Sequence, residues 1–230
     1  MARASPPHMV APWPARPPAI FVPALPIARP PTPAGTLPLL RSAAHIELSA
    51  APRYAALAPL EEMPVLALRG GRDVKRGIVD AVRRSQYSID AKQCCFDDRD
   101  ITHHLILKSE RPGFRIRLLM DLSQISEPSC ATQNLRLLEL LAAGVELRMI
   151  KPNDALHSRM HAKTWLLDNC FYCMGTGNAS HNAAENNYEE CILTRCRCVV
   201  EAGRAYFEEQ WLHPRTIAVT QDLLSRGGEA

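Results

Sequence analysis

Apolar residues between positions 63 and 212 follow two kinds of spacing. Short alternating or continuous apolar runs predict strands, and runs with apolar residues three or four positions apart predict helices. Val74, Ile78 and Val82, for example, share one side of a predicted helix. We expect strands at residues 64–69, 87–95, 114–120, 145–150, 161–167, 171–175 and 191–194, and helices at residues 72–84, 98–109, 131–143 and 199–212. Strands and helices that alternate in this way predict an α/β fold, a sheet covered by helices on both faces.

The N-terminal part of the chain has a different composition. Twelve of the nineteen prolines lie in the first forty residues. Proline removes backbone donors, and the segment lacks the apolar periodicity that a core requires. Spaced arginines and the lack of acids before Glu47 would also suit an organelle transit peptide. We expect a disordered tail or transit segment over residues 1–60 and one folded domain over residues 61–230.

Charge is unevenly distributed along the chain. Five arginines and one acid give residues 1–60 a charge of +4, and because the whole chain is +3, residues 61–230 sum to −1. Proteins that bind nucleic acid without sequence preference usually have a clear basic excess, so this balance argues mildly against a general nucleic-acid clamp. Uninterrupted apolar runs fall short of the roughly 18 residues that span a bilayer. We expect no transmembrane segment and an intracellular protein, either cytoplasmic or organellar, with the mitochondrion as one possibility.

The chain has eight cysteines, and a domain of this size does not need disulfides for stability. Free and mostly buried thiols in a reducing compartment are the expected state. The alternative is structural zinc, because Cys170 and Cys173 are spaced like zinc ligands, as are Cys196 and Cys198. The outer spacing of the two pairs is irregular, and on a strand Cys170 and Cys173 would lie on opposite faces, so zinc is the weaker interpretation.

One stretch has a pattern that indicates chemistry. On a strand, His161 and Lys163 would point to the same face and place a base beside an anion-binding charge. The glycines on either side of Thr176 would allow a tight turn and the close approach of a charged group to the backbone. Asn178 would then offer an amide donor near the same place.

These residues resemble the HKD signature of the phospholipase D superfamily, which reads H-x-K, four residues, D, six residues, G-[ST]-x-N. His161, Lys163, Asp168, Gly175 and Asn178 fill its fixed positions, and Thr176 stands where serine is usual. The sequence Asn187-Tyr188-Glu189 matches the Asn-x-Glu of single-motif members, such as the bacterial endonuclease Nuc and the mitochondrial cardiolipin hydrolase (Zucchini) group. The resemblance covers about residues 63–212 and implies the superfamily's mixed sheet, flanked by helices, with a single HKD half-site.

The resemblance also implies a mechanism. His161 would attack phosphorus and form a phosphohistidine intermediate that water later opens. Glu189 would hold the imidazole in one tautomer. Lys163 and Asn178, with Thr176 nearby, would bind the non-bridging oxygens. Asp168 belongs to the catalytic motif but would point away from His161 on a strand, so we expect it to act as a supporting residue.

A leaving alkoxide needs a proton from a second group, and the chain has no second H-x-K. We therefore expect a homodimer in which His161 of a second copy is the general acid. Two imidazoles at such close range would share one proton. The scheme needs neither a metal nor a cofactor.

The substrate stays open at this stage. A phospholipid phosphodiester, of cardiolipin or phosphatidyl type, is the first candidate, and DNA or RNA in the manner of an endonuclease is the second. A non-catalytic dimerising module is the third, and an ordinary structural role for His161 and Lys163 is the bland alternative. Arg115 and Arg117 alternate on a predicted strand and either line a solvated face or bind substrate.

Overall fold

The computed structural model describes residues 60, 63, 65–125, 131–151 and 159–225. The expected tail over residues 1–60 lies outside this part of the chain except for Leu60, which is buried in the core, as is Met63. Cys130 also lies outside the described residues. Within the described ranges, no helix combines the length and apolarity required to cross a bilayer.

One mixed sheet of eight strands forms the centre of the domain, in the order β1-β7-β6-β5-β2-β3-β4-β8. The pairs β2–β3 and β3–β4 are parallel, and the other neighbours are antiparallel. The strands are β1 (Leu66–Arg69), β2 (Ser88–Gln93), β3 (Arg115–Asp121), β4 (Glu146–Ile150), β5 (Thr164–Leu167), β6 (Phe171–Gly175), β7 (Glu190–Thr194) and β8 (Thr216–Ala218).

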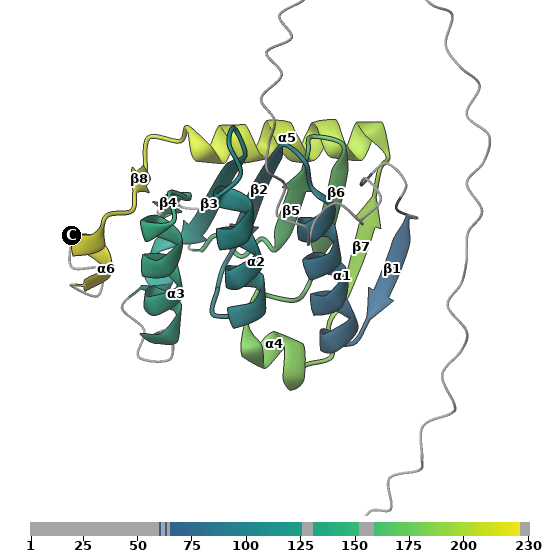
Figure 1. Cartoon of the computed structure of the whole chain (residues 1–230), viewed down its shortest axis with the longest axis horizontal. Helices are drawn as coiled ribbons and strands as arrows, with labels where there is room; N and C mark the ends of the chain where they lie inside the picture. The colour runs from purple at the N-terminus through teal and green to yellow at the C-terminus, as the bar shows by residue number, and fades with distance from the viewer. Residues whose placement is uncertain (1–59, 61–62, 64, 126–130, 152–158, 226–230) are drawn as a thin grey trace, which may run out of the picture. The chain divides into compact units, whose positions relative to one another are not determined.

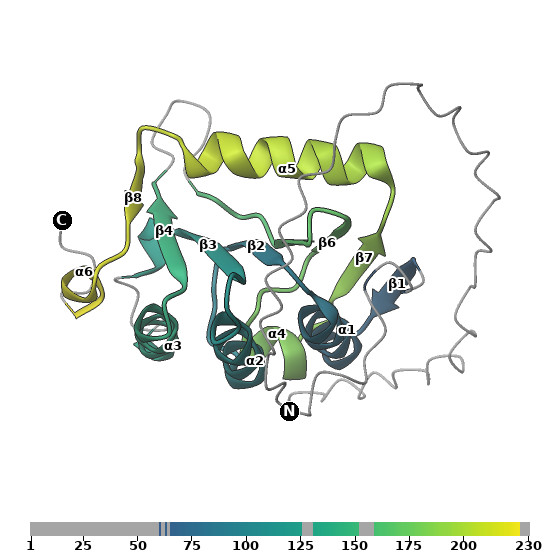
Figure 2. The same cartoon turned by 45° about the horizontal axis from the view of Figure 1, so that its top comes forward.

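Helices cover both faces of this sheet, as predicted. Figures 1 and 2 show α5 on one face and α1, α2, α3 and α4 on the other, with α6 beside α3. The helices are α1 (Gly71–Arg84), α2 (Arg99–Ser109), α3 (Ala131–Ala142), α4 (His181–Glu185), α5 (Arg197–Trp211) and α6 (Gln221–Ser225), with a 3₁₀ turn, η2 (Leu122–Gln124).

Local signals set the helix ends. The side chain of Asp98 accepts hydrogen bonds from the N–H groups of Asp100 and Ile101, which satisfies donors at the start of α2. Gly144 follows α3 with φ = 81°, a conformation that favours glycine and ends a helix.

The core has a layer on each side of the sheet. Trp165 and Leu167 of β5 pack among residues of α1 and α2, and the intervening Leu166 packs with Tyr172 and Val200 under α5. Phe207 and Trp211 of α5 are buried, which confirms the interpretation of this helix face as core. This alternation decides which strand residues face α5 and which face α1 and α2.

The two strand arginines have a structural role that the sequence did not indicate. Arg117 is buried and forms ion pairs with Asp90 at 2.7 Å and Glu208 at 2.5 Å, and Arg115 pairs with Asp90 at 3.3 Å. These contacts connect β2 and β3 to α5, so the expectation of a solvated or substrate-binding face at Arg117 is wrong. Both acids hold the pKa of the Arg117 guanidinium above its usual value, against the effect of burial.

Candidate active site

The signature residues other than Asp168 gather at one edge of the sheet, formed by the ends of its central strands. Strand β5 runs antiparallel to β2, so the start of β5 lies beside the end of β2, where Lys92 is paired with Thr164. The residues before β5, the loop after β2 and the loop after β6 therefore meet at this edge. His161, Lys163, Asn178 and Glu189 come from these segments and from the approach to β7.

His161 and Lys163 lie just before β5 and not within it, because the strand begins at Thr164. The predicted strand at residues 161–167 is thus three residues too long. The side chain of His161 is exposed, whereas Lys163 is only 7% exposed, and the ammonium of Lys163 donates a hydrogen bond to the carbonyl oxygen of His161 at 2.8 Å. A cation is thereby fixed against the backbone of an accessible imidazole.

Burial dominates the electrostatics of Lys163 and lowers the pKa of its ammonium, while Cys94, Glu189 and Cys95 act in the opposite direction. An ammonium held in a partly desolvated place interacts more strongly with an anion than one in open water. The environment suits the binding of a phosphate oxygen.

Asn178 is placed by a set of hydrogen bonds between the loops after β2 and β6. Its side-chain oxygen accepts from the N–H of Cys95 at 3.3 Å. The N–H of Ala179 donates to the side chain of Gln93 at 2.9 Å, and its carbonyl accepts from the N–H groups of Asp97 and Asp98 at 2.9 and 3.1 Å. With the amide oxygen of Asn178 occupied, its NH₂ group is the end available to bind an anion.

Gln93 and Asp97 were missed as positioning residues. The carboxylate of Asp97 accepts from the N–H of His181 at 2.6 Å and so completes the connection between the two loops. The available signal was a polar residue at the end of a buried strand and another in the loop that follows, but their partners lie more than eighty positions away.

Glu189 is half-buried beside the glycine turn. Its carboxylate accepts hydrogen bonds from the hydroxyl of Thr176 and from the amide of Asn187, the latter at 3.0 Å. A Cβ atom at Gly175 would lie 2.3 Å from the carbonyl oxygen of Glu190, so glycine permits the close approach of two backbone segments there, whereas a Cβ atom at Gly177 would make an ordinary contact of 3.4 Å with the Glu189 side chain. Gly175 is not among the described glycines with positive φ, so close packing is what requires glycine at this position.

The described hydrogen bonds do not join Glu189 to the ring of His161, so the orienting role of Glu189 stays a prediction. Thr176 also accepts a hydrogen bond from the N–H of Glu190 at 3.1 Å. The hydroxyl of Thr176 thus connects the glycine turn to the start of β7 and is occupied by protein partners.

Asp168 lies at the opposite end of β5 from His161 and Lys163. Its carboxylate accepts hydrogen bonds from three consecutive backbone N–H groups at the entry to β2, with distances of 2.7 to 3.0 Å: those of Gln86, Tyr87 and Ser88. Its own backbone is left-handed, with φ = 52°. The motif aspartate therefore connects two strands of the sheet and does not contact the reacting edge.

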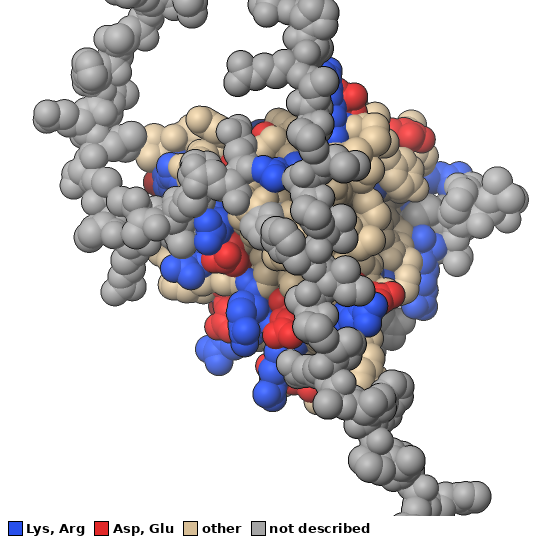
Figure 3. Space-filling model, turned by 90° about the vertical axis from the view of Figure 1, so that its right-hand side faces the viewer, with Lys and Arg blue, Asp and Glu red and all other residues tan. Residues whose placement is uncertain are grey.

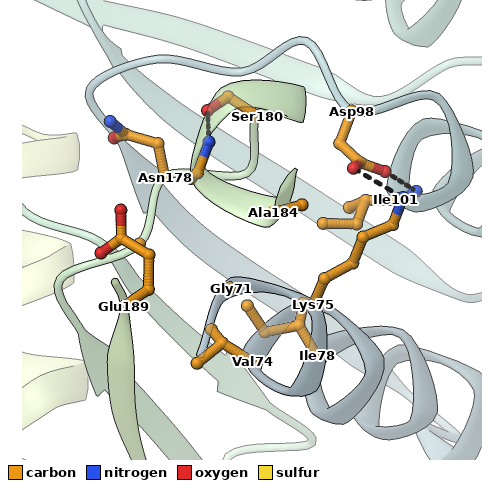
Figure 4. A pocket seen from close by; sticks show the side chains of 12 residues that line it. Gly71, Val74, Lys75, Ile78, Asp98, Ile101, Asn178, Ser180, Ala184 and Glu189 are labelled. Carbon is orange, nitrogen blue, oxygen red and sulfur yellow. Dashed lines mark hydrogen bonds and ion pairs between the residues drawn. The ribbon is translucent and has the colours of Figure 1, made fainter. Parts of the chain in front are cut away.

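A small pocket adjoins the site on the side of α1, α2 and α4 (Figure 4). Asn178 and Glu189 lie on one side of it, and the ion pair between Lys75 and Asp98, at 2.9 Å, lies on the other. Its volume is about 10 Å³. Pockets that enclose small-molecule ligands measure roughly 300–1,000 Å³, so this pocket cannot hold a phosphodiester.

The thiols have varied surroundings. Cys94, Cys173 and Cys191 are buried, Cys95 and Cys170 are half-buried, and Cys196 and Cys198 are exposed. Over the described ranges, three or more His, Cys, Asp or Glu side chains never gather in an arrangement that could hold a metal ion.

Comparisons with known proteins address the family directly. The family model described as "Cardiolipin synthase, PLD-like domain" matches residues 78–211, more than half of the chain. A search of functionally curated proteins gives no significant match.

Three solved structures share the fold. Nuc from Salmonella typhimurium, described as a phospholipase D family member, has a TM-score of 0.54 and 17% identity over 67% of this chain and 98% of its own. NucT from Helicobacter pylori has a TM-score of 0.57 and 16% identity over 67% and 99%. The phosphatidylserine synthase of Haemophilus influenzae has a TM-score of 0.51 and 15% identity over 68% of this chain and 40% of its own. At these identities the structures show a common fold, and together with the family model they place this chain in the phospholipase D superfamily, whose members are phosphodiesterases.

Proposed function

We propose that this protein hydrolyses a phospholipid phosphodiester through a phosphohistidine intermediate on His161. The observation that carries the proposal is the buried ammonium of Lys163, fixed against the backbone of the exposed His161 at an open edge of the sheet. The imidazole attacks phosphorus, while Lys163 and the NH₂ group of Asn178 bind the non-bridging oxygens. Glu189 holds the ring of His161 in the tautomer required for attack. For this role its carboxylate must exchange a hydrogen bond with Thr176 or Asn187 for one with the imidazole.

The proposed reaction requires a second copy of the chain. The departing alkoxide takes a proton from His161 of that copy across a twofold axis, and water then opens the phosphohistidine. Tyr188, next to Glu189, is fully exposed and offers an aromatic contact for that partner.

Surface properties favour a lipid over a nucleic acid. Residues 61–230 sum to −1. On the part of the face in Figure 3 that grey atoms do not cover, basic side chains lie beside acidic ones, and much of the remaining surface is uncharged. A shallow apolar groove lies between β6 and α5, lined by Tyr172, Met174, Val199 and Tyr206 among others. Exposed apolar surface of this kind suits an acyl chain or the surface of a bilayer.

The experiment presents the purified full chain, with a chelator, to three substrates: a chromogenic phosphodiester, cardiolipin vesicles and single-stranded DNA. Wild type, His161→Ala and the control His103→Ala are assayed in parallel, because His103 is exposed on α2, outside the site. We expect lipid turnover by wild type and His103→Ala and a loss of at least about 10³-fold in His161→Ala.

Each other result has a defined meaning. If only DNA is cleaved, the substrate is a nucleic acid and not a lipid. Cleavage that requires a metal contradicts the proposed mechanism. Equal activity in His161→Ala overturns the assignment of the nucleophile. If all three substrates stay intact with every protein, the non-catalytic dimerising module replaces the enzyme.

A further inference from the structure

A pair of thiols lies apart from the proposed catalytic residues, although one of them, Cys198, also lines the apolar groove between β6 and α5. Cys196 is the N-cap residue of α5 and Cys198 lies in its first turn. Both side chains are exposed, and their sulfur atoms are 3.0 Å apart in a hydrogen bond. A disulfide needs about 2.05 Å between the sulfurs, so a shift of about 1 Å would bring the two atoms to bonding distance.

We propose that Cys196 and Cys198 form a redox-active dithiol that is reversibly oxidised to an internal disulfide by a low-molecular-weight disulfide. The inference is independent of the phosphodiesterase chemistry. The described residues place no third ligand beside the pair that would make a metal site, so covalent chemistry between the two sulfurs is favoured.

The two thiols differ in a way that assigns their roles. The hydrogen bond from Cys198 lowers the pKa of Cys196, and backbone N–H groups at the start of α5 act to lower the pKa of both thiols. The same contact raises the pKa of Cys198. Because the thiolate is the reactive form, Cys196 is the attacking thiol and Cys198 the resolving one.

The reaction balances in two exchanges. The Cys196 thiolate attacks one sulfur of the small disulfide, forms a mixed disulfide and releases one small thiolate. Cys198 then loses its proton to solvent and attacks the sulfur of Cys196, which releases the second small thiolate and closes the internal disulfide. The protein loses two electrons and two protons, and the small disulfide is reduced to two thiols.

A second pair of thiols in the same chain provides an internal control. Cys173 and Cys191 lie on neighbouring strands and are both buried, and their mutual hydrogen bond together with burial raises the pKa of Cys173. A small disulfide reaches this pair only when the protein opens, so it should stay reduced under native conditions.

The experiment treats the native full chain with glutathione disulfide at about pH 7.5, blocks the remaining thiols and identifies the products by mass spectrometry after trypsin digestion. Cleavage after Arg195, Arg197 and Arg204 separates Cys196 from Cys198, so an internal disulfide leaves residues 196–197 joined to residues 198–204. We expect this product in wild type, a stable glutathione adduct at Cys196 in Cys198→Ser, and adduct formation slowed at least about tenfold in Cys196→Ser.

Three results would overturn the proposal: unmodified Cys196 and Cys198 in wild type, a wild-type adduct at Cys196 that never resolves, or oxidation of Cys173 and Cys191 at the same rate. A circular dichroism spectrum of each serine variant confirms that it is folded. Hydrolysis of the chromogenic phosphodiester by the same samples is a separate readout, because that substrate has no acyl chain to contact the groove that Cys198 lines, so failure of one proposal does not affect the other.

Discussion

The ammonium nitrogen of Lys163 lies 2.8 Å from the carbonyl oxygen of His161, so the charge of one residue is fixed against the backbone of the other. Side chains two positions apart on a regular strand would stand side by side without such a bond. The short segment before β5 instead lets Lys163 reach back over its neighbour. This arrangement makes the protonation state of Lys163 a determinant of the proposed reaction.

Activity should decline as pH rises through the lowered pKa of Lys163, because deprotonation removes the cation that binds phosphate. Lys163→Arg keeps a cation throughout the accessible pH range, so the alkaline decline attributable to this residue should disappear. The absolute rate should fall by about 10²-fold, because a guanidinium does not reproduce the position of the ammonium. The measurement is kcat/KM against pH on a chromogenic phosphodiester. An unchanged alkaline decline in Lys163→Arg would assign it to another group.

Mixed dimers should reveal the dependence on two histidines. When wild type and His161→Ala are unfolded together and refolded in varying ratios, only dimers with two wild-type chains have both the nucleophile and the acid. Activity should therefore follow the square of the wild-type fraction. A linear dependence would show that each chain acts alone, and the same series with His103→Ala as the second chain should show no loss.

Substitution of Asp168 should reduce stability much more than catalysis. Asp168→Ala leaves three backbone N–H groups of residues 86–88 without their acceptor and puts alanine at φ = 52°, so we expect a loss of about 2–4 kcal/mol in the free energy of unfolding. Asp168→Asn tolerates that backbone and keeps one oxygen acceptor, so its loss should be smaller. Urea unfolding and kcat/KM of the folded protein test this. A large loss of kcat/KM at unchanged stability would instead make Asp168 catalytic.

Lys92 should make the folded protein more stable as pH rises above neutrality. Burial lowers the pKa of its ammonium, which lies 3.9 Å from the ring centre of Tyr206, to about 8. An unfolded lysine keeps its proton up to about pH 10.4. Between these values the unfolded state binds more protons, so the free energy of unfolding rises with pH, by up to about 3 kcal/mol.

Lys92→Met should lose this rise, whereas Lys151→Met, which replaces an exposed lysine, should retain it. Urea unfolding at several pH values between about 8 and 10 measures the difference between each variant and wild type. Parallel curves for wild type and Lys92→Met would mean that Lys92 does not change its proton occupancy on unfolding.

Apolar periodicity was sufficient to predict the main elements of the fold. Every predicted strand and helix is present, because each has enough apolar positions to define a buried face. Helix α4, helix α6 and strand β8 were missed, since they have only five, five and three residues and no clear period. The start of β5 was misplaced because Lys163 bonds to the backbone of His161, a contact that periodicity does not reveal.

The spacing of the signature indicated which residues would be close together at the site, but not how they are held. Asn178 depends on Cys95 and, through Ala179, on Gln93, contacts between residues more than eighty positions apart. Asp168 belongs to the signature but lies away from the site, at the end of β5 opposite His161 and Lys163. Sequence spacing constrains separation along the chain, whereas these contacts depend on how the strands are ordered in the sheet.

The hydrogen bonds between the loops after β2 and β6 make the two segments one mechanical unit. An insertion or deletion at residues 94–98 would shift the amide of Asn178 even though neither loop belongs to the sheet. The length of the loop at residues 94–98 is therefore constrained by the position of Asn178, as the spacing of the signature is. Changes that alter substrate preference are more easily accommodated in other loops around the site. Such a loop can vary without displacing the groups that would bind the phosphate oxygens.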